Sequence, residues 1–479
     1  MKEKKIFSNL LWRLAERCGA QGVTFIVSVI LARILDPSVY GTVALVTVFT
    51  TILQVFVDSG FGTALIQKKD ADDIDFSSVF YFNIVSCAVM YAIMFFCAPL
   101  IASFYDKPEL VSLVRVQSLI LIISGVKNVQ QAYVSRNLLF KKFFFATLGG
   151  TLGAAGLGIW MAYSGYGVWA VVAQNLFNHA VDTVILWITV KWRPKKVFSL
   201  ERLKGLFRFG WKLLLSALLD AGYTQLRQLI IGKLYTDEDL AFYNKGEQFP
   251  KYIVTNINSS IDSVLLPTLS EQQDDRVSVR NMTRRAIKTS TFIMAPVMIG
   301  FAVCAEPFIR LLLTDKWLPC VPFLRIICVT YIFYPLHTAN LNAIKALGRS
   351  DLFLKLEIMK KAVGLAAVLS TMWFGVMPMA YSLLFTSVAS QIINSWPNKK
   401  LLDYSYPAQL KDILPGILLA VFMGACVYPV VFIGLPDIIT LLIQVSAGVV
   451  IYFAAAYILK MESMMYCLGF CKKFLKKKN

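Results

Sequence analysis

Residues 413–433 read ILPGILLAVFMGACVYPVVFI, and no charged side chain interrupts this run of 21 residues. A helix rises about 1.5 Å per residue, so such a run is long enough to cross the roughly 30 Å hydrocarbon core of a bilayer. Comparable apolar runs recur from one end of the chain to the other. Because a backbone in lipid must satisfy its own hydrogen bonds, and no segment alternates as a membrane β-strand does, these runs predict transmembrane helices.

The composition of the whole chain agrees with this interpretation. Of its 479 residues, 57% are hydrophobic and only 16% are charged, and the mean hydropathy is +0.62. A soluble domain carries about 25% charged residues. We therefore predict an all-α polytopic membrane protein with about 14 transmembrane helices, at residues 9–34, 38–66, 77–104, 109–134, 143–163, 167–190, 205–232, 240–266, 284–313, 320–346, 352–374, 377–397, 410–433 and 437–460.

Positive charge is concentrated in alternate connections between these spans. The segment 191–208 is strongly basic, and so is the C-terminal tail, whereas the intervening connections carry only Arg33, Lys107, Lys233 and Lys316. Basic loops stay in the cytoplasm, so both termini are expected to be cytoplasmic and the number of spans to be even. The net charge of +19 is thus a topology signal, and we expect contact with membrane lipid and no nucleic-acid partner.

Several features argue against an enzyme. The outer connections are short, which leaves no outer domain for an active site, and no Walker motif is present. The cysteines fall mostly inside apolar spans and only two histidines occur, so we expect no metal and no cofactor. Four glycines in the span 143–163 predict close helix packing rather than a nucleotide loop, namely Gly149, Gly150, Gly153 and Gly156.

The two halves of the chain resemble each other. Cys97, Pro99, Asp106 and Arg115 are answered by Cys304, Pro307, Asp315 and Arg325, at separations of about 207 to 210 residues. An even-numbered repeat keeps its orientation, so the two halves are expected to be pseudo-symmetric. We predict an N-terminal six-helix lobe (1–192), a basic cytoplasmic linker (193–204), a C-terminal six-helix lobe (205–400), two additional transmembrane helices (401–462) and a basic cytoplasmic tail (463–479).

Polar side chains follow one face of several predicted spans. The first span carries Arg13, Arg17, Gln21, Thr24 and Ser28 at helical spacing, and the seventh and eighth spans carry similar rows. A charge that faces lipid at mid-membrane costs at least about 2.5–3.5 kcal/mol. The charges of such rows therefore either pair with one another, as Lys251 with Glu247, or line a cavity, and the excess of cations favours an anionic guest such as a diphosphate.

Short motifs in both halves resemble a known family. They are LARILDPSVYG (31–41), DSGFG (58–62), GYGVWA (165–170), LLPTLSE (265–271) and ALGRSD (346–351). These segments resemble the oligosaccharide, or O-antigen type, flippases of the multidrug/oligosaccharidyl-lipid/polysaccharide exporter superfamily. The resemblance is closest to the exporters of teichuronic acid and colanic acid and extends over nearly the whole chain.

This resemblance implies a two-lobed flippase of the bacterial inner membrane that moves an undecaprenyl-diphosphate-linked oligosaccharide to the outer leaflet by alternating access, for surface polysaccharide biosynthesis. A polysaccharide polymerase and export machinery are the implied protein partners. Candidate diphosphate ligands are Arg13, Arg17, Arg227, Lys245 and Lys251; candidate cavity and sugar contacts are Gln21, Gln54, Lys127, Asn244, Gln248 and Asn258; candidate ion-coupling carboxylates are Asp58, Asp220 and Asp262.

Three other functions stay open at this point. A cation-coupled multidrug exporter of the same superfamily would need an acidic or aromatic pocket, whereas these rows are basic. A membrane polymerase or ligase would need a large outer loop. A scaffold of a polysaccharide synthesis complex, which transports nothing, would leave the intramembrane cations unexplained.

Overall fold

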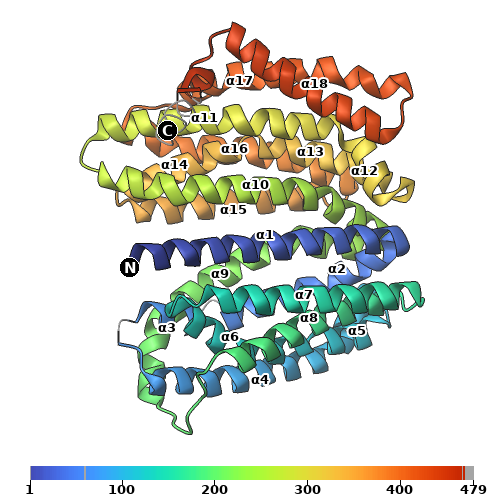
Figure 1. The fold of residues 1–479 in the computed structure, drawn as a ribbon, viewed down its shortest axis with the longest axis vertical. Helices are drawn as coiled ribbons and strands as arrows, with labels where there is room; N and C mark the ends of the chain where they lie inside the picture. Colours follow the sequence, from blue (N-terminus) through green and yellow to red (C-terminus); the bar gives the residue numbers. More distant parts are fainter. Residues whose placement is uncertain (1, 59–60, 69, 467, 470–479) are drawn as a thin grey trace. The chain divides into compact units, whose positions relative to one another are not determined.

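The computed structural model describes residues 2–58, 61–68, 70–466 and 468–469, and within these ranges it contains helices and no strand (Figure 1). The helices are α1 (Lys2–Ile34), α2 (Pro37–Asp58), α3 (Phe61–Gln67), α4 (Asp73–Tyr105), α5 (Leu110–Gln117), α6 (Leu119–Arg136), α7 (Phe140–Tyr163), α8 (Val168–Thr189), α9 (Leu200–Leu234), α10 (Asp237–Glu271), α11 (Arg276–Val303), α12 (Ala305–Leu313), the 3-10 helix η1 (Asp315–Cys320), α13 (Val321–Tyr331), α14 (Tyr334–Ala346), α15 (Ser350–Thr371), α16 (Val376–Leu402), α17 (Tyr406–Val427), the 3-10 helix η2 (Tyr428–Ile433) and α18 (Asp437–Ile458).

The predicted all-α polytopic class is confirmed, whereas the count of 14 spans is not. By length and apolar composition, 9 helical segments of the described chain are able to cross a membrane. Five long helices are not among them, namely α1, α8, α9, α10 and α15. Most of the polar rows of the sequence lie on α1, α9 and α10, so the residues of greatest functional interest are also those that weaken the span signal.

Some predicted spans are two helices in the structure. The range 109–134 is divided at Ser118 into α5 and α6, and the range 284–313 is divided at Cys304 into α11 and α12. The range 320–346 is likewise divided between α13 and α14. The apolar runs are long enough to be predicted as single spans, although a polar residue or a proline lies beside each break, namely Gln117, Pro307 and Pro335.

Contacts group the helices into two compact units, Met1–Ala241 and Phe242–Asn479, called unit 1 and unit 2 below. By this criterion α9 belongs to unit 1, where it packs on α2, α3 and α4. The predicted duplication instead makes α9 the first helix of the second lobe. Packing and duplication are different criteria, and the lobe boundaries at 192 and 205 stay a prediction.

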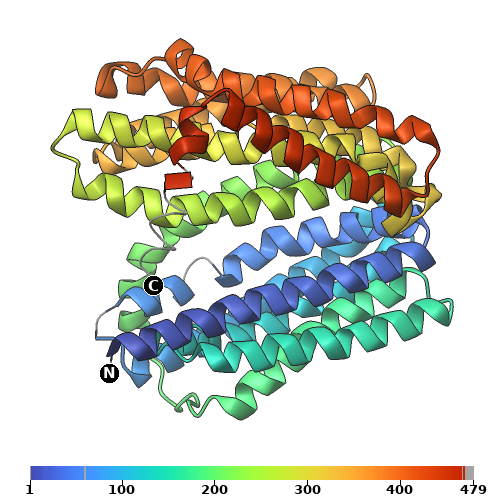
Figure 2. The same cartoon turned by 45° about the horizontal axis from the view of Figure 1, so that its top comes forward.

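Unit 1 contains a closely packed pair of helices, α7 and α8, and α1 lies along α7 (Figures 1 and 2). A Cβ atom added at Gly150 would lie 2.8 Å from Asn178 Oδ1, and one at Gly153 would lie 2.9 Å from the ring of Phe177. Both neighbours belong to α8. The prediction that these glycines allow close helix packing is confirmed at these positions, whereas Gly156 has open space around its Cβ position.

The basic linker before α9 is held against the start of α4. Lys195 Nζ lies 2.6 Å from Asp73 Oδ2, and the backbone N–H of Ser199 donates to Ser78 Oγ at 2.9 Å. Asp75, which is fully buried, accepts a hydrogen bond from Lys68 at 2.6 Å. These contacts fix the path of the linker on unit 1.

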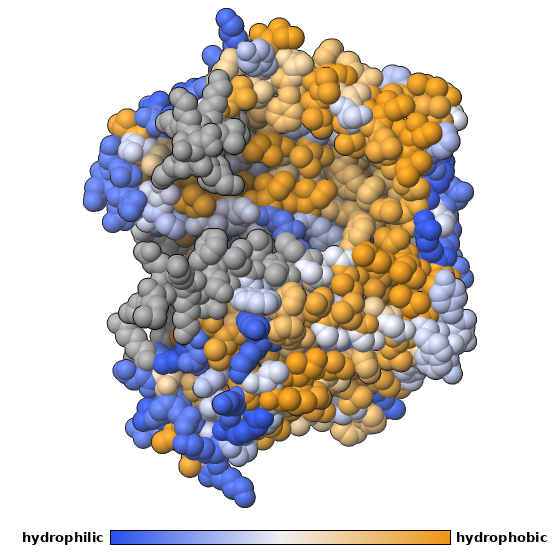
Figure 3. Space-filling model, viewed as in Figure 1, coloured by the Kyte–Doolittle hydropathy of each residue, from blue (hydrophilic) through white to orange (hydrophobic). Residues whose placement is uncertain are grey.

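In unit 2, α17 packs along α11, and α18 covers both α17 and α12. The hydroxyl of Tyr452 in α18 donates to the Phe292 carbonyl in α11 at 2.8 Å. Figure 3 shows hydrophobic side chains gathered over the middle of the unit 2 helices and hydrophilic ones at the helix ends. This distribution is expected for helices that are surrounded by lipid.

Matching contacts occur in the two halves of the chain. Arg115 Nε donates to the Phe95 carbonyl at 3.2 Å, and Arg325 Nε donates to the Ala302 carbonyl at 3.2 Å. Two helix N-termini are also capped alike, because Asp72 and Asp275 each accept from the backbone N–H groups two and three residues further on. Equivalent contacts at separations of 203 to 210 residues support the predicted duplication.

Candidate functional site

The predicted cations of the first span lie outside the described side chains. This applies to Arg13 and Arg17 in α1, and also to Asp58 at the end of α2. Further along α1, Gln21 and Thr24 are exposed, while Val27 and Leu31 pack against α7 and α8. Gln21 and Thr24 therefore lie away from the helices on which α1 packs.

The row on α9 is exposed at one end and buried at the other. Asp220 is exposed, and its backbone carbonyl accepts a hydrogen bond from Thr224 Oγ1 at 2.8 Å. Arg227, two turns later, is buried. Gln54 on α2 is half-buried.

The longest polar surface of the described chain is one face of α10. Between Lys251 and Ser263 the exposed side chains are amides, hydroxyls and charged groups, and few are apolar. At 100° per residue these positions fall on one side of the helix. The members of this α10 polar face are Lys251, Tyr252, Thr255, Asn256, Ser259, Ser260, Asp262 and Ser263.

The side chains of the α10 polar face donate hydrogen bonds to their own helix. Ser259 Oγ donates to the Asn256 carbonyl at 3.1 Å, and Ser260 Oγ donates to the same carbonyl at 2.9 Å. Ser263 Oγ donates to the Ser260 carbonyl at 2.8 Å. Because the hydroxyl protons are used within the helix, the face presents oxygen lone pairs, which can accept hydrogen bonds from a ligand rich in hydroxyl groups.

Two members of the predicted site connect α10 to α14. Asn258 Oδ1 accepts a hydrogen bond from Thr338 Oγ1 at 2.6 Å, and Asp262 Oδ1 accepts one from Asn342 Nδ2 at 2.6 Å. The two bonds are one helical turn apart on both helices. They fix α10 on α14 within unit 2 and orient the Asp262 carboxylate.

The two lysines of α10 differ in environment. Lys245 is almost fully buried, where its Nζ donates to Gln248 Oε1 at 3.0 Å and lies 5.6 Å from the centre of the Trp317 ring. Lys251 has half of its side chain exposed and lies 3.2 Å from Glu247, the pairing that the sequence predicts as structural. Only Lys251 reaches the exposed polar face, while the half-buried Asn244 is adjacent to Lys245 in the chain.

A buried ion pair lies inside unit 1. Lys127 Nζ on α6 lies 3.1 Å from Asp182 Oδ2 on α8, and both residues are buried. Lys127 is a predicted site residue, but sequence reasoning missed Asp182. A carboxylate inside a predicted span is itself a signal, because an intramembrane charge requires a partner.

A second buried polar group, which sequence reasoning also missed, connects α14, α16 and α17. Asn340 Nδ2 donates to Gln409 Oε1 at 2.8 Å, and Ser395 Oγ donates to the same oxygen at 2.9 Å. Asn398 Nδ2 donates to Asn340 Oδ1 at 2.6 Å. On the same helix pair, Asn394 Nδ2 lies 3.1 Å from His337 Nδ1, so this histidine connects α14 to α16.

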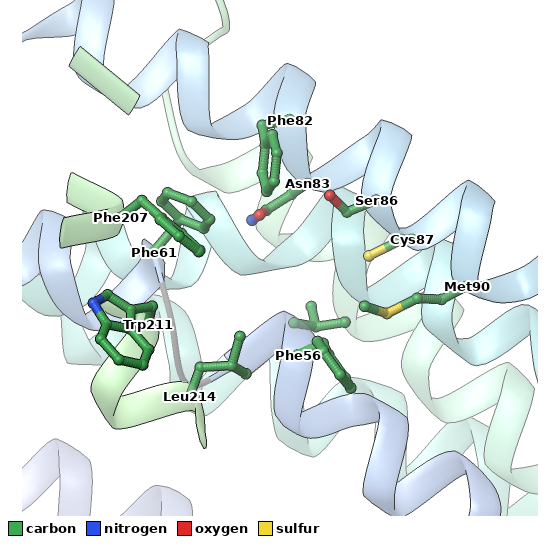
Figure 4. A pocket seen from close by; sticks show the side chains of 11 residues that line it. Phe56, Phe61, Phe82, Asn83, Ser86, Cys87, Met90, Phe207, Trp211 and Leu214 are labelled. Atoms are coloured by element: carbon green, nitrogen blue, oxygen red, sulfur yellow. The ribbon is translucent and has the colours of Figure 1, made fainter. Parts of the chain in front are cut away.

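Unit 1 also contains an apolar pocket of about 280 Å³ (Figure 4). Aromatic side chains line it, and the rings of Phe61 and Phe207 stack at a centroid distance of 6.1 Å. Asn83 and Ser86 are polar residues of its lining, and Asn83 Nδ2 donates to Asn128 Oδ1 at 3.4 Å. In the described part of the chain, no group of three or more His, Cys, Asp or Glu side chains could hold a metal ion.

The candidate spans and the polar face of one long helix identify the class as polytopic helical membrane proteins. Comparison with known proteins identifies the family. A family model described as polysaccharide biosynthesis protein matches residues 30–322, which is more than half of the chain, and the protein belongs to this family. The membership confirms the resemblance to the polysaccharide-transporter branch of the exporter superfamily, and the protein is a transporter rather than an enzyme.

Two curated relatives are similar over most of their length. The teichuronic acid biosynthesis protein TuaB of Bacillus subtilis (strain 168) is 25% identical over 415 residues, which are 84% of this chain and 85% of the relative. The succinoglycan biosynthesis transport protein ExoT of Rhizobium meliloti (strain 1021) is 25% identical over 328 residues, which are 68% of this chain and 66% of the relative.

A solved structure shows the same fold. The lipid II flippase MurJ in an inward closed conformation superposes with a TM-score of 0.74 and 15% sequence identity, over 94% of this chain and 98% of MurJ. This likeness establishes the fold and assigns no residue roles.

Proposed function

We propose that the protein is a flippase that moves an undecaprenyl-diphosphate-linked oligosaccharide from the cytoplasmic to the outer leaflet of the bacterial inner membrane. The observation that carries this proposal is the α10 polar face. Hydroxyl and amide groups on a surface that faces lipid find no hydrogen-bond partners there, whereas a sugar chain offers many. The family and its polysaccharide relatives point to the same class of substrate.

In this proposal the diphosphate and the sugars of the substrate make different kinds of contact. The diphosphate binds cationic side chains. The candidates are still Arg13, Arg17, Arg227, Lys245 and Lys251. Among those whose side chains the structure describes, Lys251 is exposed, whereas Arg227 and Lys245 are buried. Sugar hydroxyls donate to oxygens of the α10 polar face, with Gln21, Gln54, Lys127, Asn244, Gln248 and Asn258 as the predicted cavity residues.

Within that set, two contacts favour structural roles. The amide oxygen of Asn258 accepts a hydrogen bond from Thr338, and the ammonium group of Lys127 pairs with the buried carboxylate of Asp182. We therefore expect sugar contacts chiefly from Thr255, Ser259 and Ser263, which are exposed and were not among the predicted residues.

The proposal includes topology, coupling and partners. From the basic connections we expect both termini to lie in the cytoplasm. Transport proceeds by alternating access of two lobes, with Asp58, Asp220 and Asp262 as candidate carboxylates for ion coupling. The flipped lipid-linked oligosaccharide then reaches a polysaccharide polymerase and the export machinery.

Reconstitution tests this function. The purified protein is placed in liposomes that contain fluorescent undecaprenyl-diphosphate lipids with either one sugar or a full oligosaccharide, and loss of leaflet label is followed over time. We expect protein-dependent flipping of both lipids. The double variant Thr255→Val/Ser259→Ala should slow the oligosaccharide more than the single-sugar lipid, because only the longer glycan covers the α10 polar face.

Ser446→Ala provides a matched control, since Ser446 is an exposed hydroxyl on α18 that also donates to its own helix. This variant should flip both lipids normally. Equal slowing of both lipids by the α10 double variant would place the sugars elsewhere. Failure to flip several glycans, with proton and sodium gradients applied in turn, would favour a multidrug exporter or a scaffold.

A further inference from the structure

We propose that unit 1 binds an anionic membrane phospholipid in a pocket beside Arg115, at the end of α4 and α5 that is predicted to face outward. The pocket has a volume of about 430 Å³. Its lining includes Tyr91, Phe95, Pro108, Ser112, Arg115 and Leu119.

The guanidinium of Arg115 is only partly used by the protein. Its Nε donates to the Phe95 carbonyl at 3.2 Å, and its carbon lies 4.1 Å from the centre of the Phe95 ring. No carboxylate of the described residues lies within 4 Å of it. The terminal nitrogens are donors that suit a phosphate group.

The other half of the chain shows what happens when this position has a partner. Arg325 makes the same bond to a backbone carbonyl, and its Nη2 also lies 3.9 Å from Glu306. Glu306 is the extra residue of Cys304-Ala305-Glu306-Pro307, and the first half reads Cys97-Ala98-Pro99 without it. The anion that Glu306 supplies in unit 2 thus has no counterpart in the sequence of unit 1.

The surroundings indicate a lipid as the source of the anion. In unit 2 the corresponding helix, α11, is covered by α17, and α18 places Asp437 3.5 Å from Arg310. In unit 1 the corresponding helix, α4, exposes an apolar row along its length instead. The row comprises Phe82, Val85, Val89, Ile93, Phe96, Leu100 and Phe104. At 100° per residue this row lies on the side of α4 away from Tyr91 and Phe95. The pocket itself lies between two segments that are apolar and long enough to cross a membrane, Asp73–Tyr105 and Leu110–Arg136, and its lining residue Leu119 is exposed, so lipid is the available ligand.

The pocket is arranged to suit an amphiphile. Pro108 and Ser112 lie near the end of the helix pair, whereas Tyr91 is about 20 Å further along α4, at 1.5 Å per residue. The phosphate contacts Arg115, and the upper part of an acyl chain lies against Phe95, Tyr91 and Leu119. The nearest exposed carboxylate along α5, Glu109, precedes the helix and does not pair with Arg115.

Native mass spectrometry of the full-length protein tests this site. Phosphatidylglycerol, phosphatidylcholine and inorganic phosphate are titrated separately onto delipidated protein. We expect phosphatidylglycerol to bind in preference to phosphatidylcholine. Arg115→Gln should weaken phosphatidylglycerol binding about tenfold or more, the ratio expected when a charged hydrogen bond is lost. Arg115→Lys, which keeps the charge, should retain most of the binding.

Arg325→Gln is the matched control, because it removes the equivalent guanidinium where Glu306 already pairs with it. This variant should bind phosphatidylglycerol as the wild type does. Equal losses in Arg115→Gln and Arg325→Gln, or no loss in Arg115→Gln, would overturn the proposal. Inorganic phosphate that binds as tightly as the lipid would show a soluble anion site instead. None of these outcomes depends on whether the protein flips oligosaccharides.

Discussion

Lys127 Nζ lies 3.1 Å from Asp182 Oδ2 inside unit 1, with side-chain exposures of 10% and 12%. The pair joins α6 to α8, and its charges are largely removed from water and lipid. Removing one partner of such a pair leaves an uncompensated charge, which costs about 3–5 kcal/mol.

We therefore predict that Lys127→Met and Asp182→Leu each destabilise the protein by about 3–5 kcal/mol, measured as a fall in the thermal unfolding midpoint in detergent. The double variant Lys127→Met/Asp182→Leu should recover most of this loss, because both charges are removed together. Lys251→Gln, at an exposed pair, should cost no more than about 1 kcal/mol. Additive losses in the double variant would show that the two charges act independently.

A second prediction concerns the packing of α7 on α8. A Cβ at Gly150 would approach both the side chain and the backbone oxygen of Asn178, at 2.8 and 2.9 Å. Since a backbone atom cannot turn away as a side chain can, Gly150→Ala should cost about 1–3 kcal/mol. Gly156→Ala, with open space at the same helix, should be neutral or slightly stabilising.

The measurement is again the unfolding midpoint, compared between the two alanine variants under identical conditions. Equal behaviour of the two variants would mean that α7 and α8 do not approach each other as closely in the membrane as in this structure.

The sequence predicted the position of the helices better than their number. Each predicted span contains a helix, because a run of about twenty apolar residues has no other way to satisfy its backbone in lipid. The division at Cys304 between α11 and α12 was missed because the apolar run was read as one span, although Glu306 and Pro307 are typical of a helix start. The helices α9 and α10 are not among the candidate spans because they carry the polar rows, and these rows also contain the candidate functional residues.

The candidate site was predicted less completely than the fold. Of the predicted residues on α10, Lys251 and Asp262 are exposed, whereas Lys245 is buried, because spacing within one helix follows from the sequence alone but burial depends on the neighbouring helices. Lys127 was assigned to a cavity, but its pairing with Asp182 depends on how α6 and α8 are aligned. Contacts between helices depend on packing, and a single sequence does not encode their register in any readable pattern.

A third prediction follows from the buried amides that hold α17. Gln409 takes part in four hydrogen bonds, two with Asn340 and one each with Ser395 and the Tyr404 carbonyl. Gln409→Leu removes all four hydrogen bonds, so the Ser395 hydroxyl proton and the Tyr404 carbonyl lose this partner, while Asn340 keeps its bond from Asn398. Each buried group left unsatisfied costs about 1–3 kcal/mol. We expect a clear loss of stability and increased proteolysis of the connection between α16 and α17.

Gln444→Leu is the control for this variant. Gln444 is equally buried on α18 but makes one described hydrogen bond, to the Val427 carbonyl at 3.2 Å. Its loss should lower the unfolding midpoint by much less. If Gln444→Leu were the more damaging change, the amide group around Gln409 would not be what stabilises α17.

The last prediction separates the structural and coupling roles of Asp262. Its Oδ1 accepts a hydrogen bond from Asn342 Nδ2 at 2.6 Å, and the residue itself is exposed on the α10 polar face. Asp262→Asn keeps an acceptor oxygen for Asn342 but removes the charge and the ability to bind a proton or a sodium ion. If Asp262 couples transport to a gradient, liposome flipping by this variant should fall to the rate measured without a gradient, at an unchanged unfolding midpoint.

Asn342→Ala should instead lower the midpoint and keep the response to the gradient, because it removes the donor and leaves the carboxylate. Asp274→Asn changes an exposed carboxylate in the connection between α10 and α11 that is not a coupling candidate, and it reports whether loss of any exposed charge has the same effect. A full response to the gradient in Asp262→Asn would leave Asp262 as a hydrogen-bond acceptor between α10 and α14 and move the search for the coupling group to Asp220 and Asp58.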